Sequence, residues 1–219
     1  YDGKILVPFP VESALSGVME KVGENNELWY RTFFEIKKEW MGADKRIMLN
    51  FGGVDWEATV WVNGKLAGSH KGGYDAFSFD ITEYLLSAQR QELTVKVWDP
   101  VDEGKQPRGK QVSNPHALWY TSVTGIWQTV WLEPVNKTHI ETIKISPDID
   151  RARLGIDLSL SGEGEGNLII SSLFLDGREI SQVHTKSGNS IYFDIEDQKL
   201  WTPDSPTLYD LDVKLLNAQ

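Results

Sequence analysis

The stretch from Val54 to Asp80, VDWEATVWVNGKLAGSHKGGYDAFSFD, decides the fold of this chain. Small or apolar residues occupy every second position from Trp56 to Val62, which is the period of a β-strand with one buried face. Asn63-Gly64 follows at once, and this dipeptide accepts the two positive φ angles of a type I′ turn. The pattern therefore predicts a hairpin between Trp56–Val62 and Lys65–Ser69.

Further strands are predicted on both sides of this hairpin, from short runs rich in aromatic and β-branched residues. Only Val11–Val18 and Thr82–Leu86 carry a short helical pattern, so the fold class is all-β. Up to Pro134 the predicted strands are Leu28–Ile36, Arg46–Phe51, Phe77–Ile81, Glu92–Trp98 and Ile126–Leu132. After Pro134 they are Ile140–Ser146, Leu154–Ser159, Leu168–Leu175, Arg178–Thr185, Ser190–Ile195 and Tyr209–Leu216.

The chain changes character at Pro134. Of its nine tryptophans, only Trp201 lies beyond that residue. The later strands follow one another at intervals of about ten residues, as in an immunoglobulin-type sandwich of about seven strands. We therefore predict two domains, 1–134 and 135–219, the second lacking its last strand and leaving an unpaired edge near Tyr209–Leu216.

Composition excludes several classes of function. A net charge of −10 disfavours nucleic acid and anionic membranes as partners. The absence of cysteine excludes disulfides, thiolate metal sites and a cysteine nucleophile. The four histidines are scattered, and no phosphate loop or dinucleotide fingerprint is present, so we expect neither metal nor cofactor. Cytoplasmic and periplasmic or secreted locations both stay open.

Five ordered motifs resemble those of glycoside hydrolase family 2, the family of β-galactosidases, β-glucuronidases and β-mannosidases. Together they extend over nearly the whole chain. They are LWYRTF (28–33), NFGGVDW (50–56), VWVNG (60–64) leading into GGYDAFSFDIT (72–82), GIWQTVWLE (125–133) and LWTPDSP (200–206).

The resemblance implies a jelly-roll sugar-binding domain over 1–134, followed by an immunoglobulin-like domain. In the family a TIM barrel comes next and supplies two glutamates, and retaining glycosidases hold two such carboxyls about 5 Å apart. A barrel needs roughly 250 residues, so we expect no catalytic residue in this chain and no activity from it alone. The implied partners are a carbohydrate substrate and the barrel, and a homo-oligomer is possible. A stand-alone carbohydrate-binding module and a structural spacer are the alternatives.

Most of the motif residues have a structural explanation. Val60, Val62, Phe77 and Phe79 are core positions by alternation, and Asp80 is placed to cap a short turn. Trp127 and Trp131 have the same parity in the predicted strand Ile126–Leu132. We therefore expect both to face one side of the sheet, in the core or at a domain interface.

Residues that contact sugar are expected in loops, where side chains are not already buried in the core. A pyranose offers apolar C–H faces that stack on aromatic rings, and hydroxyls that need polar partners. The long polar loop Pro100–Thr124 contains both kinds of group, and the candidates there are Arg108, His116, Trp119 and Tyr120. His116 can also be read as an ordinary polar loop residue, and Trp119 as an anchor of the loop.

The resemblance adds Asn25 as a candidate. Family members lend to the active-site pocket an asparagine that precedes the first aromatic strand, and Asn25 lies at the matching distance before Tyr30. They also lend an acidic residue from the loop before the Gly-Ile-aromatic motif, but NPHALW (114–119) contains none. His116 is our candidate to replace it as a hydroxyl partner. The pair Asn26-Glu27 looks like the family's acid/base motif, but we interpret it as a solvated entry to a strand.

Overall fold

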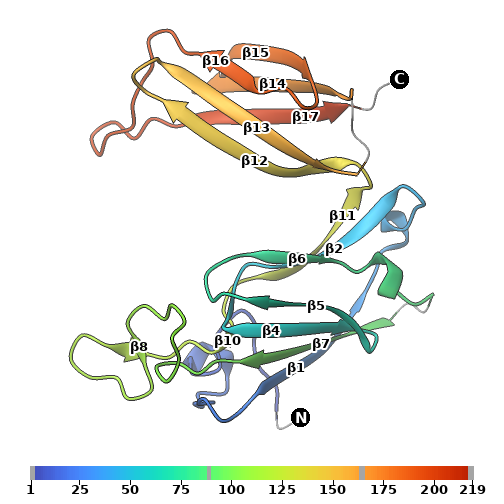
Figure 1. Ribbon diagram of the computed structural model, residues 1–219, viewed down its shortest axis with the longest axis vertical. Helices are drawn as coiled ribbons and strands as arrows, with labels where there is room; N and C mark the ends of the chain where they lie inside the picture. The colour runs from blue at the N-terminus through green and yellow to red at the C-terminus, as the bar shows by residue number, and fades with distance from the viewer. Residues whose placement is uncertain (1–2, 88–89, 163–165, 217–219) are drawn as a thin grey trace. The chain divides into compact units, whose positions relative to one another are not determined.

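The computed structural model describes residues 3–87, 90–162 and 166–216. It divides the chain into two compact units, Tyr1–Val135 and Asn136–Gln219. The described residues form strands joined by loops, and their helices are limited to single 3₁₀ turns: η1 (Ala14–Ser16), η2 (Lys38–Trp40) and η3 (Thr82–Tyr84). The all-β prediction is therefore confirmed (Figure 1).

The first unit is a jelly-roll sandwich of two main sheets. One sheet has the order β1 (Leu28–Glu35), β7 (Arg90–Trp98), β4 (Glu57–Val62), β5 (Lys65–Lys71). The other has the order β11 (Val130–Asn136), β2 (Lys45–Phe51), β6 (Phe77–Asp80). Two short pairs complete it: β3 (Val54–Asp55) with β10 (Gly125–Ile126), and β8 (Gln111–Val112) with β9 (Tyr120–Thr121). Its core draws on both sheets, with Phe51, Val60 and Val95 buried.

The predicted hairpin is confirmed as β4 and β5. Asn63 and Gly64 have φ angles of 51° and 75°, as the type I′ turn requires. The Asn63 amide also donates to the Gln91 side chain at 2.7 Å and to the Tyr84 carbonyl at 2.9 Å, and it accepts from the Glu92 amide at 2.9 Å. The turn is thus held by local backbone geometry and by a neutral side chain with several partners.

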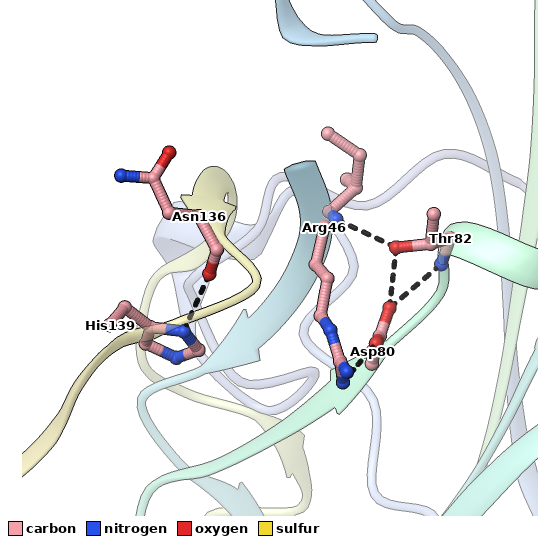
Figure 2. A network of polar contacts seen from close by, with 6 residues as sticks. Arg46, Asp80, Thr82, Asn136 and His139 are labelled. Carbon is pink, nitrogen blue, oxygen red and sulfur yellow. Dashed lines mark hydrogen bonds and ion pairs between the residues drawn. The ribbon is translucent and has the colours of Figure 1, made fainter. Parts of the chain in front are cut away.

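The N-cap of η3 is Ile81, one residue after the predicted Asp80, but the Asp80 side chain bonds to the first residue of that turn. It accepts from the Thr82 backbone amide at 3.0 Å and from the Thr82 hydroxyl. Arg46 pairs with its second oxygen at 3.2 Å, and the Thr82 hydroxyl in turn accepts from the Ile47 amide at 2.8 Å. Figure 2 shows this network, which joins β2 to the end of β6. It also shows the His139 ring contacting the Asn136 carbonyl at 2.8 Å.

The strand predicted over Ile126–Leu132 is wrong, because the chain leaves the sheet in its middle. β10 ends at Ile126 and β11 begins at Val130. The intervening residues bond across to the glycine pair instead, with the Trp127 amide donating to the Gly53 carbonyl at 3.3 Å. Trp127 and Trp131 consequently do not share one strand. Trp127 is half-buried, whereas Trp131 is 43% exposed.

The second unit is an immunoglobulin-like sandwich. One sheet is β12 (His139–Asp148), β13 (Arg153–Ser161), β16 (Ile191–Asp194), and the other is β15 (Arg178–Lys186), β14 (Leu168–Leu175), β17 (Tyr209–Leu216). Each strand predicted beyond Pro134 has its counterpart here. Ile156, Leu173 and Phe193 are among the side chains that fill the core. Within the described residues, β17 lies at an edge of its sheet, as expected.

Candidate functional site

The long loop that follows β7 has its two ends joined by one buried carboxylate. Asp99 accepts from the Val101 amide at 2.8 Å and from the Thr124 hydroxyl at 3.1 Å. Asp99 is 2% exposed and Thr124 is fully buried. Burial raises the pKa of Asp99, against the lowering effect of these hydrogen bonds. The loop is therefore anchored at its base, while its middle reaches toward solvent.

A second carboxylate holds the loop from the N-terminal segment. Glu12 accepts from the Ser122 hydroxyl and from the Thr124 amide, both at 3.0 Å. Ser122 is buried, so these bonds lie under the loop. The segment that precedes β1 thus takes part in fixing the loop position.

The third carboxylate, Asp55, comes from β3 and is 4% exposed. It accepts from the Gln111 side chain at 3.1 Å, and the Gln111 oxygen accepts from the Val123 amide at 2.6 Å. Burial raises the pKa of Asp55 to about 7, and the charges of Asp99 and Glu12 add to the effect. The ion pairs of the described residues include none of these three carboxylates. Asp55 therefore titrates near neutral pH.

Next to this cluster, the Gly72–Asp75 turn meets Trp127. The Trp127 indole donates to the Gly73 carbonyl at 2.7 Å, and Tyr74 stands edge-on to the same indole with ring centroids 6.2 Å apart. Gly73 is required here, because a Cβ would lie 2.5 Å from the Asp55 carboxylate. Tyr74 is 53% exposed and adds a polar aromatic group to this end of the jelly roll.

The structure gathers three of the predicted sugar contacts on two neighbouring parts of the loop, which pair as β8 and β9. Arg108 donates to the Asp102 carbonyl at 2.7 Å, and its guanidinium lies 6.0 Å from the centre of the Trp119 ring. Tyr120 is 65% exposed, with the Lys110 ammonium 5.9 Å from its ring centre. Two aromatic rings of the loop, Trp119 and Tyr120, therefore each have a cationic side chain beside them.

His116 and Asn25 lie in two separate segments. The exposed His116 ring contacts the Asn114 carbonyl at 2.9 Å, and the exposed Asn25 amide donates to Glu24 at 2.8 Å. Within the described residues, neither hydrogen bond leaves its own segment. The segments themselves are linked, because Lys21 donates to the Ser113 carbonyl.

Glu27 has the environment of a solvated strand entry. Its carboxylate pairs with Lys96 at 2.9 Å, and this hydrogen bond lowers its pKa. A carboxyl stabilised in the ionised state is a poor general acid, since such acids need a raised pKa. The interpretation of Asn26-Glu27 as a solvated entry to a strand therefore agrees with the contacts of Glu27.

Sequence reasoning missed these three carboxylates and Gln111. Asp55 gave one available signal, an acid inside the apolar run of NFGGVDW. Glu12 and Asp99 lie far away in sequence and carry no pattern that brings them to Asp55. Among the described residues, no group of histidine, cysteine or acidic side chains is arranged to hold a metal. The same residues include no helix long and apolar enough to cross a membrane.

Comparison with known proteins gives a consistent result. The model described as "Glycosyl hydrolases family 2, sugar binding domain" matches residues 5–133, and the one described as "Glycosyl hydrolases family 2" matches residues 138–219. A β-galactosidase of Thermoanaerobacter pseudethanolicus is 30% identical, over 86% of this chain and 26% of that protein. A β-glucuronidase of Paenibacillus borealis is 27% identical, over 97% of this chain and 37% of that protein.

Solved structures show the same fold. The β-glucuronidase of Bifidobacterium dentium complexed with coumarin-3-O-glucuronide superposes with a TM-score of 0.75 at 22% identity, covering 97% of this chain and 40% of that one. A β-glycosidase from Bacteroides vulgatus gives a TM-score of 0.68 at 25% identity, covering 86% and 24%. The chain thus spans well under half the length of the proteins that it matches.

Proposed function

Because this chain belongs to glycosyl hydrolases family 2, we propose that it forms the non-catalytic, sugar-handling region of a retaining β-glycosidase. The observation that carries the proposal is the order of the matches, with the sugar binding domain over 5–133 followed by the second family domain over 138–219. The proposed reaction is hydrolysis of a terminal β-linked sugar by two carboxyls of a barrel domain elsewhere in the parent protein.

In this proposal, the loop between Asp99 and Thr124 forms one wall of the sugar pocket. Trp119 and Tyr120 offer ring faces to the C–H groups of a pyranose, and Arg108 offers donors to its hydroxyls. His116 and Asn25 supply further polar contacts. The three carboxylates under the loop contribute by fixing its base, so that contacts made by the loop are held on a rigid scaffold.

The wall role is tested by kinetics in the full-length enzyme. Removing a group that binds ground state and transition state alike raises KM and leaves kcat unchanged. We expect His116→Ala and Trp119→Ala to raise KM roughly tenfold, on the order of 1.4 kcal/mol of lost binding, with kcat within about twofold. His184→Ala, which alters an exposed histidine of the second unit, is the matched control. Unchanged KM in both loop variants contradicts the wall role.

Both β-galactosidases and β-glucuronidases are among the relatives, so two substrate classes are candidates for the full-length enzyme. Turnover of 4-nitrophenyl β-galactoside and β-glucuronide by the full-length enzyme separates them. This chain by itself is expected to hydrolyse neither. Saturable turnover by the 219-residue chain contradicts the non-catalytic assignment.

A stand-alone carbohydrate-binding module is the second candidate, because the jelly roll is also an architecture of sugar-binding modules. Sequencing the gene beyond the codon for Gln219 distinguishes the two proposals. A barrel-coding region supports the glycosidase, whereas an immediate stop codon favours the binding module.

A further inference from the structure

A hollow of about 870 Å³ lies beside the beginning of β1. Ligand sites in proteins commonly measure about 300–1,000 Å³, so an oligosaccharide segment fits this volume. None of the loop candidates from Arg108 to Tyr120 lines the hollow. The side chains that matter for recognition are Lys4, Glu20, Lys21, Asn26, Glu27 and Trp29.

Trp29 gives this hollow an aromatic wall that is already fixed in place. It is 45% exposed although it belongs to a strand whose next residue, Tyr30, is buried. Its ring stacks against Trp61 of β4, with centroids 5.6 Å apart and planes within 17°. The stack restrains the indole on a rigid sheet and leaves nearly half of the residue accessible, so little entropy is lost when a ligand packs on it.

The polar lining suits hydroxyl groups rather than a charged ligand. The charges of Lys4 and Lys21 balance those of Glu20 and Glu27. The Glu27 carboxylate is held in place by Lys96 at 2.9 Å. Asn26, another lining residue, adds an exposed amide whose nitrogen donates to the Val22 carbonyl at 2.7 Å, and this bond orients the group.

We propose that this hollow, the Trp29 cleft, is a second carbohydrate site that binds a neutral oligosaccharide. One sugar ring stacks its C–H face on the accessible part of the Trp29 indole. Its hydroxyls exchange hydrogen bonds with Asn26 and with the Glu27–Lys96 pair. The cleft adjoins the Asp99–Thr124 loop, because Lys21 in its lining donates to the Ser113 carbonyl. The site requires no catalytic role for the chain.

The Trp29 cleft is tested by affinity gel electrophoresis of this chain through galactomannan, β-1,4-galactan, β-glucan and, as an anionic comparison, polygalacturonate. We expect retardation by at least one neutral polysaccharide and none by polygalacturonate. Trp29→Ala is expected to weaken the binding at least tenfold. Trp201→Ala, which removes a tryptophan that is 58% exposed in the second unit, is expected to leave it unchanged.

Two milder variants keep the test decisive if Trp29→Ala fails to fold, as judged by circular dichroism. Trp29→Phe keeps a smaller stacking face, and Asn26→Ala removes only the exposed amide, so each is expected to weaken binding severalfold. The proposal is overturned if no neutral polysaccharide retards the chain, if polygalacturonate alone does, or if the folded Trp29 and Asn26 variants bind normally. None of these results alters the kinetic test of His116 and Trp119, so the two proposals fail separately.

Discussion

The hairpin turn at Asn63-Gly64 and the loop from Asp99 to Thr124 are both fixed by polar side chains, but by opposite means. The turn uses one neutral amide whose partners lie on β7 and at the end of η3. The loop uses three carboxylates, Glu12, Asp55 and Asp99, of which Asp55 and Asp99 are buried. Burial raises the pKa of Asp55 to about 7. The turn is therefore insensitive to pH, whereas the support of the loop depends on the protonation of a buried acid.

The largest expected effect comes from Asp55→Asn. The folded-state pKa of Asp55, about 7, lies above the ordinary value of 3.8, so folding favours the protonated acid. Its stabilising contribution is complete below pH 3.8 and is lost as the pH rises toward 7. Asparagine stays neutral and still accepts from Gln111. As the pH rises from 4 to 8, the unfolding free energy of Asp55→Asn should therefore increase relative to that of the wild type, by up to about 4 kcal/mol.

Urea unfolding across this pH range measures the difference in unfolding free energy between the two proteins. Asp204→Asn, an exposed site in the second unit, serves as the control. A constant difference between Asp55→Asn and wild type over the range contradicts the picture of a buried titrating acid.

The next effect compares the glycine that follows the loop, at the start of β10, with a glycine of the turn. Gly125 has a φ of 91°, and a Cβ there would overlap the Tyr30 hydroxyl. Gly64 has a φ of 75° but open space around it. Gly125→Ala should lower the unfolding free energy by about 3 kcal/mol, from the left-handed backbone and overpacking together. Gly64→Ala should lower it by about 1 kcal/mol.

Chemical denaturation checks both glycine variants, and Tyr30→Phe tests the cause. The phenylalanine removes the overlapping hydroxyl, so part of the Gly125→Ala loss should return in the double variant. Full additivity of the two substitutions contradicts the proposed overlap.

The last comparison concerns the turn amide. Asn63→Ala removes its hydrogen bonds and places a less tolerant residue at a φ of 51°. We expect a loss of about 2 kcal/mol. Asn63→Gly keeps the positive φ accessible, so its loss of unfolding free energy measures the contribution of the hydrogen bonds alone. Thermal melts at pH 5 and pH 8 should give the same loss, and a loss that changes with pH contradicts the comparison with the loop.

The same contrast explains what could be predicted from sequence. Alternation and the Asn-Gly turn are local signals, so β4, β5 and the strands of the second unit were found with small errors at their ends. The break between Ile126 and Val130 was missed because it depends on Trp127 bonding to Gly53 and Gly73, which are distant in sequence. Glu12, Asp55 and Asp99 were missed for the same reason. The roles of Arg108, His116, Trp119, Tyr120 and Asn25 in sugar binding stay predictions.

The closure of the loop at its base has a practical consequence for protein engineering. Asp99 bonds to residues at both ends, so the chain enters and leaves the loop at one point. Residues 102–121 therefore form a cassette that can be exchanged between relatives without moving the sheets beneath. A graft that keeps Asp99, Val101, Gln111 and the Ser122–Thr124 segment retains these bonds and the link from Gln111 to Asp55 and Val123. Such a swap, made in a single segment of DNA, tests whether the loop sets sugar specificity.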